Sequence, residues 1–113
     1  MKQEIKNKIN EFENRVNDTK GRVKTYFCGD EQSRNAVYMV CEGKGYGYEL
    51  CVRVDNLCVF NSYSSETVEE AFKEMRNEFY KFIKKTKKEF SDNGFAYDEY
   101  IDTLDELKSV IAG

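Results

Sequence analysis

Apolar residues at the start of the chain recur at helical spacing. Ile5, Ile9, Phe12 and Val16 fall at positions i, i+4, i+7 and i+11, which places them on one side of a helix. The positions between them are mostly lysine, glutamate and asparagine. The pattern predicts a helix over residues 2–20 that buries one narrow stripe, and Gly21 is placed to end it.

The middle of the chain changes to the period of β-strands. Strands are predicted over residues 22–28, 36–41, 46–54 and 57–63. Apolar and polar residues alternate in most of these segments, whereas residues 36–41 form one continuous apolar run that is typical of a central strand. Asp55 and Asn56 should join the last two strands in a tight turn, because both residue types tolerate positive φ.

A direct pairing of Val54 with Leu57 across this turn predicts the two faces of the sheet. Cys51, Arg53, Cys58 and Phe60 would share a mixed face, and Leu50, Val52, Leu57 and Val59 would share an apolar face. This division is typical of an antiparallel sheet that is covered on one side.

Two further helices are predicted after the strands. Ser64 or Ser65 can be the N-cap of the first, which should end near Asn93-Gly94. Its buried stripe comprises Val68, Phe72, Met75, Phe79, Phe82 or Ile83, Thr86 and Phe90. The last helix, over residues 97–111, should bury Tyr100 or Ile101, Leu104, Leu107 and Ile111. We therefore predict one α+β domain over residues 1–113, with an N-terminal helix, an antiparallel sheet of three or four strands and two C-terminal helices.

Charge is distributed unevenly along this chain. Residues 91–113 hold six carboxylates and one base, Lys108, whereas the rest of the chain carries 17 bases and 15 acids. The net charge of −3 therefore originates at the C-terminal end. Acidic helices at chain ends often serve only solubility. Here, however, Tyr97 and Tyr100 lie among the acids, and tyrosine is frequent in protein interfaces. Both interpretations of the helix, solubility and binding, are open.

We expect a binding surface to combine the acidic helix with the tight turn. Its candidate residues are Asp55, Asn56, Tyr97, Asp98, Glu99, Tyr100, Asp102, Asp105 and Glu106. The partner that matches these charges is a protein with a basic, nucleic-acid-binding surface.

A stripe of lysines marks the helix that follows the strands. Lys81, Lys84, Lys85 and Lys88 lie at i, i+3, i+4 and i+7, and such a stripe can follow the phosphates of a nucleic acid. The acids at the start of this helix and the bases toward its end also suit the helix dipole. We prefer a solvated face, without direct nucleic-acid binding, and keep the nucleic-acid face as the alternative.

The residue types argue against catalysis and against a metal site. The chain has no histidine, the residue most often used for general acid–base catalysis, and no pattern pairs a nucleophile with a base. Cys28, Cys41, Cys51 and Cys58 lack Cys-x-x-Cys spacing, so we expect reduced thiols without zinc. We predict no enzyme activity, no cofactor and no small-molecule substrate.

The hydrophobic runs of the chain are short. None approaches the roughly 20 residues that span a bilayer, and the first residues do not form a signal segment. We therefore expect a protein of the cytoplasm that does not enter membranes.

Four motifs between Tyr48 and Leu107 carry a resemblance to a known family. They are Leu50-Cys-Val-Arg-Val-Asp-Asn56, Ser62-Tyr-Ser-Ser65, Glu66-Thr-Val-Glu-Glu-Ala-Phe72 and Tyr97-Asp-Glu-Tyr-Ile-Asp-Thr-Leu-Asp-Glu-Leu107. This stretch resembles the small acidic anti-CRISPR proteins that inhibit type II RNA-guided nucleases. Members of that family place such carboxylates in the nuclease's pocket for its short DNA recognition sequence, where they imitate phosphates.

The resemblance implies a non-catalytic, protein-binding inhibitor. Such a protein would be encoded by a phage or another mobile element and would act in the cytosol of the host cell. Two alternatives are open: a small nucleic-acid-binding module that uses the lysine face of residues 81–88, and an antitoxin-like interaction protein.

Overall fold

The computed structural model describes residues 2–94 and 98–112 and has the predicted α+β layout. The elements are α1 (Gln3–Asp18), β1 (Val23–Cys28), β2 (Ala36–Cys41), β3 (Tyr48–Val54), β4 (Leu57–Ser64), α2 (Val68–Asp92) and α3 (Glu99–Ile111). The four strands form one antiparallel sheet in the order β1-β2-β3-β4. The prediction of an N-terminal helix, an antiparallel sheet and two C-terminal helices is confirmed.

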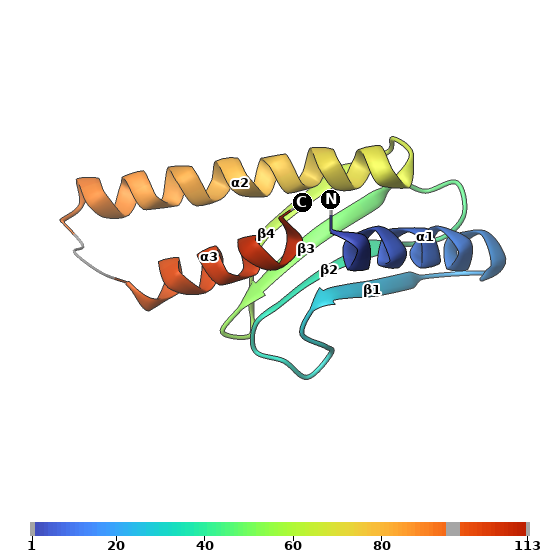
Figure 1. The fold of residues 1–113 in the computed structure, drawn as a ribbon, viewed down its shortest axis with the longest axis horizontal. Helices are drawn as coiled ribbons and strands as arrows, with labels where there is room; N and C mark the ends of the chain where they lie inside the picture. The colour runs from blue at the N-terminus through green and yellow to red at the C-terminus, as the bar shows by residue number, and fades with distance from the viewer. Residues whose placement is uncertain (1, 95–97, 113) are drawn as a thin grey trace.

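The three helices form a layer against the sheet (Figure 1). The long helix α2 lies beside both shorter helices, and α3 runs antiparallel to it toward the N-terminal end of α1. Most residues of the predicted helical stripes supply the core beneath this layer, whereas Phe90, Tyr100 and Ile101 are only half-buried. The buried residues are Ile5, Ile9, Phe12, Val16, Val68, Phe72, Met75, Phe79, Ile83, Thr86, Leu104, Leu107 and Ile111. From the sheet, Leu50 and Val52 are fully buried against them.

A β-bulge in the last strand makes its two faces differ from the prediction. Val54 pairs with Leu57 as expected, but the register shifts so that Val52 lies opposite Phe60. Phe60 therefore lies on the core side, with its ring centroid 5.4 Å from that of Phe79. The extra residue of the bulge reverses the alternation, which is why the predicted placement of Phe60 beside Arg53 is wrong. Leu57, predicted for the apolar face, is 67% exposed.

The N-cap of α2 also differs from the prediction. Thr67 is the cap, and its hydroxyl accepts a hydrogen bond from the Glu70 amide at 3.4 Å. Ser64, one of the two predicted caps, is instead the last residue of β4, and its hydroxyl donates to the Glu74 carboxylate at 3.0 Å. Near the start of the chain, α1 ends at Asp18 with Thr19 as its C-cap, so Gly21 lies two residues beyond the cap.

Each strand carries one of the four cysteines, and none of them forms a disulfide. Burial raises the pKa of the Cys51 thiol to about 12, and the nearby charge of Glu49 adds to this effect. Burial likewise raises the pKa of Cys28. No group of three or more histidine, cysteine, aspartate or glutamate side chains within residues 2–94 and 98–112 is arranged to hold a metal ion.

We expect the thiols to differ widely in their reaction with iodoacetamide at mildly alkaline pH. Only Cys58 is exposed, so it should be alkylated first, whereas Cys51 and the buried Cys41 should react only when the protein unfolds. Peptide mass spectrometry over a time course measures the order. Modification of Cys51 as fast as Cys58 would contradict the burial described above.

Among the described residues, no helix has both the length and the apolar composition that crossing a membrane requires.

Candidate partner-binding cleft

The tight turn between β3 and β4 is formed by Asp55 and Asn56, at φ 53° and 67°. Positive φ at both positions is the conformation that a two-residue hairpin turn favours, as the sequence predicted. The Asp55 amide donates to the side-chain oxygen of Asn35 at 2.9 Å, and the Asn56 amide donates to the Arg34 carbonyl at 2.9 Å. An ion pair also joins Arg34 to Asp55. The turn is therefore anchored to the end of the β1–β2 loop.

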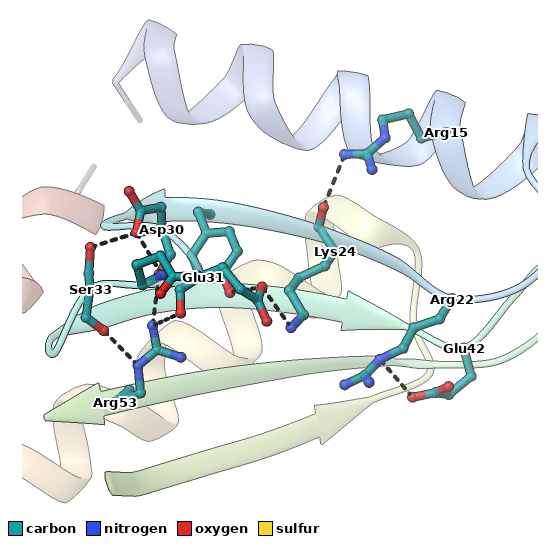
Figure 2. A network of polar contacts seen from close by, with 10 residues as sticks. Arg15, Arg22, Lys24, Asp30, Glu31, Ser33, Glu42 and Arg53 are labelled. Carbon is teal, nitrogen blue, oxygen red and sulfur yellow. Dashed lines mark hydrogen bonds and ion pairs between the residues drawn. The ribbon is translucent and has the colours of Figure 1, made fainter. Parts of the chain in front are cut away.

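The β1–β2 loop, residues 29–35, is itself held by Arg53 of β3. Figure 2 shows this guanidinium reaching the loop backbone, where it donates to the carbonyls of Ser33 at 3.0 Å and Asp30 at 2.7 Å. Gly29 allows the loop to fold back, because a Cβ at this position would lie 2.6 Å from the Asn35 carbonyl oxygen. These contacts fix where Arg34 and Asn35 meet the turn.

Helix α3 approaches the turn with its N-terminal end. Asp98 is its N-cap, and the carboxylate accepts a hydrogen bond from the Tyr100 amide at 2.7 Å. The Tyr100 ring stacks on Phe90 of α2 with 6.0 Å between centroids. Burial raises the pKa of Tyr100, and the charge of Asp98 raises it further. The phenol is therefore neutral at physiological pH and can donate a hydrogen bond.

The loop, the turn and the start of α3 enclose an open cleft of about 540 Å³. Its lining residues are Arg34, Asn35, Val54, Asp55, Glu99, Tyr100 and Thr103. Three of the residues predicted from the sequence, Asp55, Glu99 and Tyr100, are thus brought together although the turn and the helix are far apart in the chain. Sequence reasoning missed Arg34, Asn35, Val54 and Thr103. No local pattern links the β1–β2 loop to the turn, and Val54 and Thr103 are neither acids nor tyrosines, the residue types that defined most of the predicted surface.

The remaining predicted acids have different surroundings. Asp102 and Glu106 are exposed on α3, beyond the cleft. Asp105 is half-buried and forms an ion pair with Lys87 of α2 at 2.9 Å, so a base distant in sequence neutralises part of the acidic helix. Tyr97 lies outside the described residues. The acidic surface therefore consists of the cleft rim and the outer side of α3.

Two lysines of the stripe on α2 are neutralised by acids of the same helix. Lys81 pairs with Glu78 at 3.2 Å, and Lys88 pairs with Asp92 at 2.7 Å. The last turn of α2 contains no base, so the lysines do not lie where the helix dipole would stabilise them most. This placement weakens the dipole explanation for the stripe.

Comparisons of the chain with protein-family models, with curated proteins and with solved structures gave no match. The geometry of the cleft is therefore the starting point for a functional proposal. What this arrangement offers is an anchored acidic rim with a neutral tyrosine beside it, which suits recognition of a basic surface.

Proposed function

We propose that this chain is a non-catalytic inhibitor that binds a basic, nucleic-acid-binding surface of another protein through its acidic cleft. The observation that carries the proposal is the convergence of the β3–β4 turn and the start of α3 on one cleft. Both segments belong to the surface expected from the sequence. Their convergence turns two separate acidic segments into one candidate docking site.

Electrostatics supports this type of partner. The charged residues that line the cleft are Asp55, Glu99 and Arg34, and the ion pair between Arg34 and Asp55 leaves a net charge of −1 from Glu99. Asp102 and Glu106 extend the negative surface along α3. A nucleic-acid channel is lined with lysine and arginine to neutralise phosphates, so carboxylates on a rigid helix can compete for the same cations. Opposite charges would also accelerate the encounter between the two proteins.

The most concrete target is a type II RNA-guided nuclease. The support comes from the resemblance over residues 48–107, which includes both the turn and the acidic helix. In this version, the carboxylates occupy the nuclease's pocket for its short DNA recognition sequence and exclude the DNA. The protein would then be a phage or mobile-element product that acts in the host cytosol.

A titration of the purified chain into a panel of type II nucleases, each loaded with guide RNA, tests the proposal. We expect loss of DNA cleavage and of target-DNA binding by at least one member of the panel. The inhibition should weaken with salt, because the Debye length falls from about 10 Å at 0.1 M to about 3 Å at 1 M. If no member binds the chain, and lysates of candidate hosts contain no basic protein that it captures, the proposed function is wrong.

A further inference from the structure

A second groove lies between α2 and α3, separate from the acidic cleft. It has a volume of about 340 Å³ and is lined by Tyr80, Lys81, Ile83, Lys84, Lys87 and Lys108. The two helices lie side by side and antiparallel (Figure 1), so lysines from both of them meet here. Lys85 and Lys88, which belong to the predicted stripe, are not among the lining residues.

Lys108 changes the interpretation of the lysine stripe. It is the one base in residues 91–113, and the fold places it against the lysines of α2 rather than against the acids of its own helix. Its ammonium lies 5.1 Å from the centroid of the Tyr80 ring, and the Arg76 guanidinium lies 5.9 Å from the same centroid. The tyrosine is thus the centre of a cluster of cations.

Four lysines line this groove, and acids pair with two of them. Glu78 pairs with Lys81 and Asp105 pairs with Lys87. Within the described part of the chain, neither Lys84 nor Lys108 forms an ion pair. Like charges that are crowded on one surface repel one another. An anionic ligand would neutralise this cluster.

We propose that this groove binds the phosphate backbone of a single strand of nucleic acid. Lysine binds phosphate as a point charge, and four lysines line the groove. Its volume is near the lower end of the range for small-ligand sites, about 300–1,000 Å³, which suits one nucleotide unit of a strand. Tyr80 and Ile83 offer an aromatic and apolar wall against which a sugar or base can pack. The carboxylates on the outer side of α3 repel phosphates and confine the strand to the groove.

Fluorescence anisotropy with labelled oligothymidylate and oligouridylate of about 12 nucleotides tests this site. At about 50 mM salt we expect binding in the micromolar range, with a log–log salt slope of about −0.7 per phosphate contacted. Lys84→Glu with Lys108→Glu should weaken binding by at least about tenfold, a change of about 1.4 kcal/mol. Lys84→Glu alone should show part of this loss and leaves the last turn of α3 intact.

The matched control is Lys85→Glu with Lys44→Glu. Both lysines are exposed and lie outside the groove, and the change in net charge is the same. We expect this variant to bind almost like the wild-type chain at the same salt concentration, apart from a small loss through net charge. The proposal fails if neither oligonucleotide binds the wild-type chain, if the control loses as much affinity as the groove variant, or if a folded Lys84→Glu variant binds unchanged. These substitutions do not alter the cleft, so nuclease inhibition reports on the proposed function independently.

Discussion

Replacement of Phe79 by alanine is expected to lower the free energy of unfolding by about 3–5 kcal/mol. The side chain is fully buried, and its ring packs near those of Phe60 and Phe82, with centroids 5.4 Å and 6.5 Å away. Truncation removes this apolar burial and leaves a cavity between α2 and the sheet that close packing does not allow to collapse fully. Urea denaturation followed by circular dichroism measures the change.

Leu57→Ala is the control for the Phe79 variant. This leucine is also large and apolar but 67% exposed, so its truncation should change stability by less than about 0.5 kcal/mol. A double-mutant cycle between Phe60 and Phe79 adds a test of the bulge, since residues in contact couple by about 0.5–3 kcal/mol. Additive effects would mean that Phe60 lies on the opposite face, as the register without a bulge requires.

Charge reversal on the acidic surface is expected to have the largest effect on partner binding. Glu99→Lys, Asp102→Lys and Glu106→Lys together should lower the affinity for the partner at least about 100-fold, because like charges facing each other cost several kcal/mol. Asp98 and Asp105 are left unchanged. The first caps α3, where loss of a cap costs about 0.5–2 kcal/mol, and the second pairs with Lys87.

Reversal of three acids on α1 is the control for this variant. Glu11, Glu13 and Asp18 are exposed on another helix, and their replacement by lysine changes the net charge by the same amount. Binding can be measured by calorimetry with a nuclease that the wild-type chain inhibits, after thermal unfolding has shown that both variants fold. If the α3 variant binds as tightly as the wild type, the acidic helix serves only solubility. If both variants lose affinity equally, net charge rather than the acidic surface of α3 determines binding.

The elements of the fold were predictable because their signals are local. The continuous apolar run at Ala36–Cys41 gave the bounds of β2, and the 3.6-residue period gave the buried stripes of all three helices. The turn at Asp55 and Asn56 followed from the tolerance of both residue types for positive φ, which the structure confirms. The sequence alone therefore determined the order and the types of the elements and their approximate bounds.

Only the tertiary structure decides which face of the sheet a residue lies on and which of several candidate residues caps a helix. A bulge adds one residue without disturbing the hydrophobic composition, so only contact with α2 decides that Phe60 lies on the core side. Ser64, Ser65 and Thr67 can all cap a helix. In the fold, Ser64 is the last residue of β4, and the Thr67 hydroxyl is the one that accepts from the Glu70 amide. Such alternatives differ little in local energy, and the packing of the whole chain separates them.

The sequence determines where charges cluster along the chain, and the fold determines which of these charges meet. The sequence determined that the acids gather in residues 91–113 and that lysines gather on the helix before them. Only the antiparallel contact of α2 with α3 pairs Asp105 with Lys87 and adds Lys108 to the lysine groove. Only the anchoring of the β1–β2 loop brings Arg34 to Asp55 and supplies one wall of the cleft. Coulomb interactions depend on distance in space, and the fold sets that distance independently of separation along the chain.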